Sequence, residues 1–388
     1  MAKSYSEIND KIKSGKAVVL TAEEVSELSR SLSPKEIAQK VDVVTTGTFG
    51  AMCSSGAFIN FGHASPPIRM EKIELNGIRV SGGLAAVDTY IGATDCNPER
   101  PAYGGAHLIE DLVNGKKITL EAWGKGTDCY PRKHIRTTIA LDSVNEAILY
   151  NPRNAYQNYN VATNSTDRIK HTYMGTLLPR FRNAAYSTAG ELSPLINDPE
   201  CRTIGLGTRI FLCGTEGYVT WNGTQFHSTK EVNAFGIPTG NARTIAVIGD
   251  LKKMSPDFLR AAYYEKYGIS LFVGIGIPIP ILDEEMARRV SIRNEQIETT
   301  IIDYGAGNRV LGKTNYAALR SGEIVLNGQK IRTAPVASLV KAREIADRLK
   351  EWIARGQFLL SEPVRPMPVG TSLRSLEDDN TPETCSHS

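Results

Sequence analysis

The chain has 388 residues, of which 41% are hydrophobic and 22% are charged, and its formal net charge is only +3. This is the composition of a globular protein, and the small charge argues against a nucleic-acid binder, which needs a strongly basic surface. The longest apolar stretch, residues 269–282, contains two prolines and is shorter than the roughly 20 residues of a membrane span. The N-terminus has no apolar segment typical of a signal peptide. We therefore expect a cytoplasmic protein that binds neither nucleic acid nor membrane.

The N-terminal segment is predicted to be helical. Thr21 and Glu24 form one capping-box pattern, and Ser33 and Glu36 form a second, with Pro34 at the first helical position. Short β-branched and apolar runs then alternate with glycine. They predict strands at 43–46, 73–75 and 78–80, with the last two joined by an Asn76-Gly77 hairpin turn, and a further strand at 116–123.

The second half of the sequence predicts strands first and then an alternation of strands and helices. Strands are expected at 208–213 and 218–221, joined by a Gly-Thr-Glu-Gly turn, and turn residues follow at Asn222-Gly223. After Gly240 we expect a strand at 244–248, a helix capped by Ser255-Pro256-Asp257 and a strand at 269–274. A helix at 283–290 and a strand at 299–303 come next, and 330–332 is extended. The clearest amphipathic helix runs from Pro335 to Ala354.

These elements predict a mixed α/β (α+β) fold with mixed sheets and a long C-terminal helix. There is no internal repeat and no low-complexity linker, so residues 1–369 are expected to form one intertwined unit, in one body or two lobes. From Gly370 the residues are polar and acidic without a period, which predicts a disordered tail over 370–388.

Cys53 is the first candidate for chemistry, because it lies in the Gly- and Ser-rich segment TTGTFGAMCSSG, residues 45–56. Glycines allow backbone N–H groups to converge on an anion, such as a thiolate, a sulfide or a carboxylate. His63 and Arg69 follow in the same segment and are expected to reach this site. The alternative is a closely packed turn in which Cys53 is a small buried side chain. The residues alone leave both interpretations open.

Cys129 is the second candidate, because it lies among cations in AWGKGTDCYPRKHIR, residues 122–136. A thiol beside Lys, Arg or His is ionised more readily, and the thiolate is the reactive form. The alternative is a solvated loop, but an exposed thiol without a function would be an oxidation liability. This favours a functional Cys129.

The other cysteines are expected to be structural or peripheral. Cys96 ends a predicted strand, Cys213 lies in an apolar strand, Cys201 has no special neighbours and Cys385 lies in the tail. Neither the cysteines nor the histidines have the spacing of a metal-binding motif, so no dedicated metal site is indicated. Gly-rich pairs such as Gly274–Gly276 do not complete a nucleotide-binding pattern.

Long segments around these cysteines resemble the homocysteine-biosynthesis family. They are TTGTFGAMCSSGAFINFGHASPPIRM, SGGLAAVDTYIGATDCN and AWGKGTDCYPRKHI, at residues 45–70, 81–97 and 122–135. The resemblance continues through IDYGAGNRVLG to APVASLVKAREIADRLKEWI, and so covers nearly the whole chain before the tail. Some members carry a C-terminal pair of CBS domains. The sequence ends at Ser388 without them, so regulation by an adenosyl ligand is not expected.

The resemblance implies an L-aspartate semialdehyde sulfurtransferase of methionine biosynthesis in anaerobes. The family reaction joins sulfide to aspartate semialdehyde and reduces the adduct to homocysteine. Cys129 matches the cysteine that carries sulfur as a persulfide, and Cys53 matches a second family cysteine. Electrons are expected from a separate ferredoxin-like iron–sulfur protein, with no tightly bound cofactor, and a homo-oligomer is expected.

The chemistry of that reaction suggests roles for nearby residues. His63 or His134 is expected to donate the proton that lets the adduct oxygen leave as water. Arg69, Arg132 and Arg136 are candidates to bind the substrate carboxylate. Cys53 is expected to resolve the persulfide if it lies close to Cys129. Two alternatives stay open: a protein in which Cys53, Cys96 and Cys129 ligate an iron–sulfur cluster, and a non-catalytic scaffold that docks a ferredoxin.

Overall fold

The computed structural model describes residues 2–376, and its N-terminal part contains three short capped helices. They are α1 (Tyr5–Lys13), α2 (Ala22–Leu28) and α3 (Pro34–Lys40). Both predicted capping boxes are confirmed, and a third, between Ser4 and Glu7, begins α1. Two strands between and after these helices, β1 (Val19–Thr21) and β2 (Val43–Thr45), form a small sheet with β21 (Pro278–Pro280). The helix α6 (Glu284–Val290) packs on α3 and confirms the helix predicted there.

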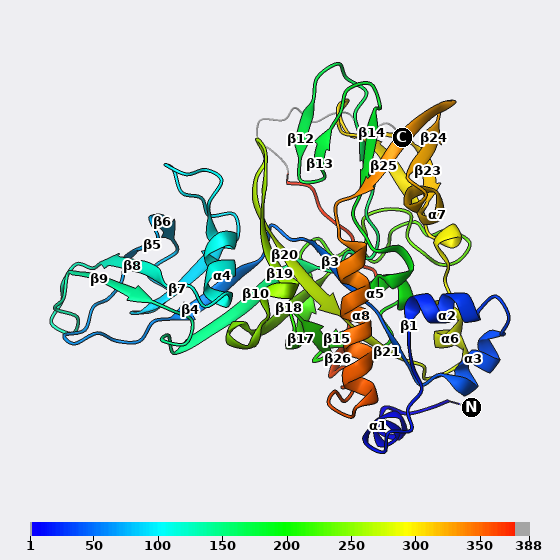
Figure 1. Ribbon diagram of the computed structural model, residues 1–388, viewed down its shortest axis with the longest axis horizontal. Helices are drawn as coiled ribbons and strands as arrows, with labels where there is room; N and C mark the ends of the chain where they lie inside the picture. Colours follow the sequence, from blue (N-terminus) through cyan, green and yellow to red (C-terminus); the bar gives the residue numbers. More distant parts are fainter. Residues whose placement is uncertain (1, 377–388) are drawn as a thin grey trace.

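A nine-stranded antiparallel sheet forms the body of the molecule (Figure 1). Its strands, in spatial order, are β19 (Leu259–Tyr264), β20 (Gly268–Gly276), β16 (Arg209–Leu212), β17 (Thr215–Asn222), β18 (Ile245–Asp250), β10 (Glu146–Asn154), β4 (Gly56–Asn60) and β7 (Asp88–Gly92), with β3 (Thr48–Ala51) also paired to β20. The long helix α8 (Leu339–Ala354) packs on β20 and β3. The chain approaches α8 so closely that a Cβ on Gly47 would lie 2.1 Å from the Ala342 carbonyl oxygen.

A four-stranded sheet projects from one end of this body (Figure 1). It consists of β6 (Ile78–Val80), β5 (Lys72–Leu75), β8 (Ile118–Trp123) and β9 (His134–Ile139). We call residues 61–85 and 114–140, which contain these strands and their connections, the arm. The predicted Asn76-Gly77 turn joins β5 to β6 with both residues at positive φ. The helix α4 (Gly105–Val113), which was not predicted from the sequence, contacts both the arm and the body.

A second lobe is built on a six-stranded mixed sheet. Its order is β23 (Arg309–Asn315), β22 (Glu298–Asp303), β11 (Val161–Thr163), β14 (Asn183–Tyr186), β25 (Gln329–Pro335) and β24 (Glu323–Leu326). The hairpin of β12 (Lys170–Thr172) and β13 (Gly175–Leu177) and the helix α7 (Tyr316–Arg320) complete it. The lobe has its own cluster of buried apolar side chains, separate from the main core. The fold is therefore mixed α/β, in two lobes built from interleaved segments.

Three details differ from the sequence-based expectations. The helix predicted at Ser255-Pro256-Asp257 is wrong: these residues make a single 3-10 turn, Pro256–Phe258, before β19. The backbone of β19 pairs with β20 instead, so this region forms an antiparallel hairpin rather than an α/β alternation. The turn after β16 lies at Cys213-Gly214, both at positive φ, and not at Gly214–Gly217. The long helix starts at Leu339 because Pro335 still belongs to β25.

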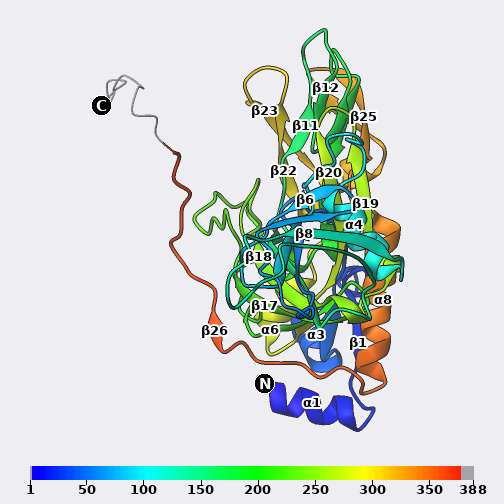
Figure 2. The ribbon, with the colours of Figure 1, turned by 90° about the vertical axis from the view of Figure 1, so that its left-hand side faces the viewer.

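The C-terminal segment leaves the body as an extended strap. Strand β26 (Arg365–Pro366) pairs with β15 (Gly205–Leu206), and Thr371 is hydrogen-bonded to Ser228 (Figure 2). Residues 370–376 contain no helix or strand, and the remainder of the predicted tail lies outside the described residues. No helix in the part of the chain that the structure describes is long and apolar enough to cross a membrane.

Candidate functional site

Cys53 lies in the tight turn between β3 and β4, at the wall of a cavity of about 510 Å³. The turn is closed by a hydrogen bond from the Ser55 N–H to the Met52 carbonyl oxygen, at 3.0 Å. Both lobes contribute to the cavity. Its lining includes Ala51, Met52, Cys53, Ser54, Thr94, Arg153, Tyr156, Tyr159, Tyr173, Met174, Ser187, Gln225, Tyr267, Val336 and Ala337. The Gly-rich segment therefore places a half-buried thiol where a small ligand can enter.

Two hydroxyl groups contact the Cys53 sulfur. The Cys53 thiol donates a hydrogen bond to Ser270 Oγ at 3.2 Å, and its Sγ atom lies 3.4 Å from the Tyr267 hydroxyl. Burial, followed by the hydrogen bond to Cys53, raises the pKa of Tyr267 well above its ordinary value. The phenol therefore stays protonated and can donate to a Cys53 thiolate, so the Cys53 site is suited to a negatively charged sulfur.

A chain of tyrosine hydroxyls forms the wall of the cavity on the side of the second lobe. Tyr159 donates to the Tyr173 hydroxyl at 3.1 Å, and the Tyr173 and Tyr304 hydroxyls lie 2.7 Å apart. The Tyr267 ring packs edge-on against the ring of Tyr173. Burial raises the pKa of Tyr159 and of Tyr304. The wall therefore offers neutral hydrogen-bonding groups and aromatic surface rather than charge.

Arg153 supplies a positive charge in the same cavity. Its Nε atom donates to Thr224 Oγ1 at 2.9 Å, and its backbone N–H donates to Asn151 Oδ1 at 2.8 Å, which together fix the start of the side chain. Among residues 2–376, no carboxylate lies within 4.0 Å of its guanidinium group. A half-buried guanidinium without an internal carboxylate partner is suited to bind the carboxylate of a ligand. No motif distinguishes Arg153, so it was not among the residues predicted from the sequence.

Cys129 lies on the exposed loop between β8 and β9, in the arm. Two of the predicted partners surround this loop. The His63 ring stacks on the neighbouring Tyr130, with centroids 6.1 Å apart, and Arg132 donates to the Ser65 carbonyl oxygen at 2.7 Å. His63 and Arg132 therefore lie on the Cys129 side.

The other predicted residues of the arm are next to this loop. His134 and Arg136 both bond to the Glu121 carboxylate, each at 3.0 Å, across β8 and β9. Arg69 is exposed, and its carbonyl oxygen would lie 2.3 Å from a Cβ on Gly124, at the base of the loop. The expectation that His63 and Arg69 reach Cys53 is not met, because β4 carries the chain away from the Cys53 turn for about 16 Å before the arm begins.

The structure does not bring Cys53 and Cys129 together within one chain. No arm residue is among the described residues that line the Cys53 cavity, and the contacts of the Cys129 loop given above lie within the arm. Cys96 is exposed next to Gly104, while Cys201 and Cys213 are buried. Within residues 2–376, no three His, Cys, Asp or Glu side chains are grouped as metal ligands, so one chain does not gather Cys53, Cys96 and Cys129 around a cluster.

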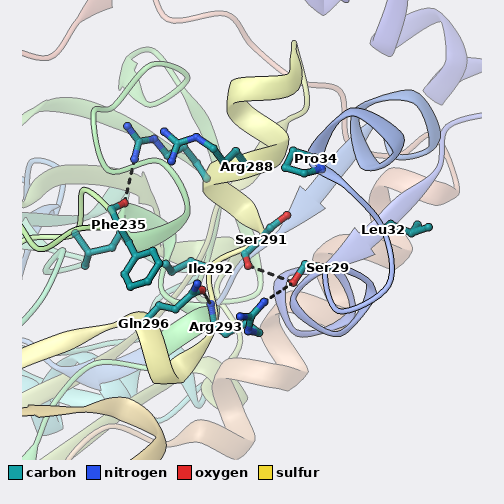
Figure 3. Close-up of a pocket in the computed structure, with 11 residues that line it drawn as sticks. Ser29, Leu32, Pro34, Phe235, Arg288, Ser291, Ile292, Arg293 and Gln296 are labelled. Atoms are coloured by element: carbon teal, nitrogen blue, oxygen red, sulfur yellow. Dashed lines mark hydrogen bonds between the residues drawn. The ribbon is translucent and has the colours of Figure 1, made fainter.

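A second cavity lies between α2, α3 and α6, and it is rich in arginine (Figure 3). Its volume is about 280 Å³. Arg288 is paired with Glu285, and Arg289 with Glu200 and Glu285, so most of its positive charge is already neutralised. Arg293 donates to Ser29. This cavity contains no thiol, and the Cys53 cavity is the better candidate for an active site.

Comparison with known proteins identifies the family to which the chain belongs. The model of the family described as "Homocysteine biosynthesis enzyme, sulfur-incorporation" matches residues 17–360. The chain belongs to this family of sulfur-incorporating enzymes. It is 50% identical over 379 residues to a Methanosarcina acetivorans protein named "L-aspartate semialdehyde sulfurtransferase", which covers 97% of this chain and 74% of that protein. A Methanocaldococcus jannaschii protein of the same name is 52% identical over 381 residues, covering 93% and 72%.

More distant relatives are also archaeal. A Methanothermobacter thermautotrophicus protein without a functional name is 27% identical over 329 residues, covering 82% of this chain and 72% of that protein. No solved structure matches the chain. The resemblance inferred from the cysteine-containing segments is confirmed, and the family places both cysteines in an enzyme that incorporates sulfur during homocysteine biosynthesis.

Proposed function

We propose that this enzyme transfers sulfur to L-aspartate semialdehyde and forms L-homocysteine, with Cys129 carrying the sulfur as a persulfide. In balance, the Cys129 persulfide, the aldehyde, four electrons and four protons give the Cys129 thiol, homocysteine and water. A persulfide donor supplies the sulfur, and a ferredoxin-like iron–sulfur protein supplies the electrons. The proposal is supported by two relatives named for this activity and by the thiol and the unpaired guanidinium that share one cavity.

The proposed order of bonds begins with attack of the terminal persulfide sulfur on the aldehyde carbon. The Cys53 thiolate then attacks Cys129 Sγ, which releases the thiohemiacetal and leaves a Cys53–Cys129 disulfide. Two electrons and two protons reduce that disulfide. The thiohemiacetal loses water, and two further electrons and protons reduce the thioaldehyde to the thiol of homocysteine.

The surrounding residues then have distinct roles. Arg153 binds the substrate carboxylate in the Cys53 cavity, where its guanidinium has no internal carboxylate partner. Tyr267 and Ser270 hold the Cys53 sulfur. His63 and His134, which flank the Cys129 loop, are the proposed proton donors for the departing hydroxyl group. Arg69 and Arg132 of the arm remain predicted substrate-binding residues.

The test is an anaerobic assay of homocysteine formation from aspartate semialdehyde, a persulfide donor and an artificial reductant. We expect Cys129→Ser to abolish turnover and Cys53→Ser to slow it, while Cys96→Ser, another exposed cysteine, leaves it unchanged. Mass spectrometry of the protein after exposure to the donor should find one added sulfur on Cys129 that dithiothreitol removes. Equal and mild losses in the Cys53 and Cys129 variants would rule out the division of roles.

A further inference from the structure

One face of the nine-stranded sheet is aromatic and open to solvent. It is formed by Phe58, Tyr90, Ile148, Tyr150, Tyr218 and Ile248, which we call the outer face. Phe58 lies opposite Tyr90 and Ile148 on the adjacent strands, and Ile248 lies opposite Tyr150 and Tyr218. Phe58 is 41% exposed and Tyr218 44% exposed. The outer face therefore extends across five neighbouring strands, β7, β4, β10, β18 and β17.

The outer face is unusual for the free side of a sheet. The opposite side chains, such as Ala57, Leu149 and Val247, are fully buried in the core, as expected for an antiparallel sheet covered on one side. The uncovered side of such a sheet normally alternates to polar residues, yet here most of the positions are aromatic or aliphatic. A continuous exposed patch of this composition is typical of a protein–protein interface.

Charges at the two ends of the outer face favour a second copy of this chain as the occupant. Glu146 marks one end and has no ion pair among the described residues, whereas Asp250 and Glu216 at the same end are paired with Lys253 and Arg209. At the other end, Arg365 of the strap lies over the Trp221 ring, 5.2 Å from its centroid, and no described carboxylate pairs with it. A copy turned by half a turn would place Glu146 against Arg365 twice, which is the self-complementarity that a two-fold interface requires.

The positions of the two cysteines give the contact a function. Thiol–disulfide chemistry requires the sulfurs of Cys53 and Cys129 to touch, but one chain holds Cys53 in the body, between β3 and β4, and Cys129 in the arm, between β8 and β9. The Cys129 loop is exposed at the end of the arm strands, and the Cys53 cavity is open to solvent. We propose that a second copy docks on the outer face and brings its Cys129 loop to the Cys53 cavity, so that each active site contains residues of two chains. The proposal rests on the proposed function of these cysteines.

The first test is disulfide trapping of the full chain with diamide, which oxidises two adjacent thiols to a disulfide and is itself reduced to the hydrazine. We expect a covalent dimer on a non-reducing gel, with Cys53 of one chain linked to Cys129 of the other in the mapped peptides. Cys53→Ser and Cys129→Ser should each abolish it, and Cys96→Ser should retain it. A Cys53–Cys129 disulfide within a monomer would overturn the proposal, and so would a chain that is monomeric by light scattering.

The second test is complementation between the Cys53→Ser and Cys129→Ser variants. Random mixing of Cys53→Ser and Cys129→Ser chains should restore about a quarter of wild-type activity, because half of the dimers then contain one complete site of two. If the mixture is no more active than the mean of the two variants measured alone, the shared site is wrong while the proposed function stands. If both variants are fully active alone, the proposed function itself is wrong.

The third test addresses the outer face. The double variant Phe58→Glu with Tyr218→Glu should become monomeric by light scattering and lose activity while keeping the wild-type circular dichroism spectrum. Val325→Glu is the matched control, because Val325 is an exposed side chain of the second lobe, and this variant should stay dimeric. A double variant that remains dimeric and active would overturn docking on the outer face.

Discussion

Cys53 lies in the turn before β4 and Arg153 lies near the end of β10, and they meet at one cavity because β4 and β10 are neighbours in the sheet. A thiol held by two hydroxyls and a guanidinium without a carboxylate partner suit different parts of one ligand. The thiol serves the sulfur chemistry, and the guanidinium binds the carboxylate of the aldehyde substrate. Binding through the carboxylate would hold the aldehyde carbon beside the sulfurs, which accelerates attack through proximity.

Replacement of Arg153 tests this arrangement. Arg153→Ala should raise KM for aspartate semialdehyde by about 10- to 100-fold, since a charge-assisted bond to the carboxylate is lost, while kcat falls less. Arg153→Lys should recover part of the loss, because it keeps the charge but not the two-pronged geometry. Steady-state kinetics of both variants provide the measurement, with the exposed Arg168→Ala as control. An unchanged KM in Arg153→Ala would contradict the assignment.

The sequence predicted the two candidate thiols, Cys53 and Cys129, but not the cavity around Cys53. Cys53 and Cys129 are distinguished by their immediate neighbours, and neighbours in sequence are what a pattern can read. Arg153, Tyr173 and Tyr267 come from three separate segments that only the pairing of distant strands brings together. His63 is close to Cys53 in sequence but lies on the arm, because the direction of β4 is a tertiary property.

At the scale of elements, sequence patterns predicted correctly those features that depend only on neighbouring residues. The two predicted capping boxes and the Asn76-Gly77 turn depend on side chains within a few positions of each other. The helix predicted at Ser255 failed because its cap is real, with Ser255 accepting from Asp257, but the residues after it pair with β20. Strand pairing outweighs a local helical preference, as it does for weak propensities in general.

The contact of Gly47 with α8 supports a stability prediction. Gly47→Ala should lower the free energy of unfolding by about 3 kcal/mol, because its Cβ would collide with backbone atoms of the helix that cannot move independently. Chemical denaturation measures the change. Gly50→Ala in the neighbouring strand is the matched control, since the nearest atom to its Cβ would be 3.5 Å away. Similar losses in both variants would contradict this explanation.

Asp42 attaches the N-terminal helix to the body and makes stability depend on acid. Its carboxylate accepts from Lys11 at 2.7 Å, Lys3 at 2.9 Å and the Val18 N–H at 3.0 Å. Burial opposes its charge, but these bonds outweigh burial and lower the pKa of Asp42. The unfolded carboxyl titrates near its ordinary value of about 4, so the contribution of Asp42 is complete above that pH and is lost as the pH falls through the lower native pKa.

Asp42→Asn should therefore reduce the free energy of unfolding at neutral pH by about 3 kcal/mol, because two lysines lose their carboxylate partner. The loss should shrink as the pH falls below about 4. Urea unfolding at several pH values measures both effects. The exposed Asp10→Asn is the control, and a variant whose deficit does not depend on pH would argue against the assigned linkage.

At the scale of the whole molecule, the two lobes cannot be separated by cutting the chain once. The six-stranded sheet of the second lobe uses residues 161–186 and 298–335, while the strands of the large sheet lie before these two segments and between them. The second lobe contains tyrosines whose hydroxyls are buried. Tyr159, Tyr304 and Tyr316 all have a pKa raised mainly by burial.

These tyrosines predict a loss of stability in alkali. Below about pH 10 each of these tyrosine hydroxyls is protonated in both the folded and the unfolded chain. Above that pH the hydroxyls ionise only in the unfolded chain. The free energy of unfolding should then fall by about 1.4 kcal/mol per pH unit for each buried tyrosine. Urea unfolding above pH 9 tests this, and Tyr316→Phe should reduce the slope. Ionisation of these phenols in the intact protein at their ordinary pKa, detected by absorbance, would contradict it.

The packing of the arm has a consequence for kinetics. Its apolar side chains Ile73, Leu75 and Leu120 belong to the same buried cluster as Leu108 of α4 and the core of the body, so the arm is stiff and does not fold back. Cys129 therefore stays at a fixed distance from the Cys53 of its own chain. If the site is shared between chains, specific activity must depend on enzyme concentration. Dilution below the dissociation constant of the dimer would then abolish activity, although each chain would remain folded.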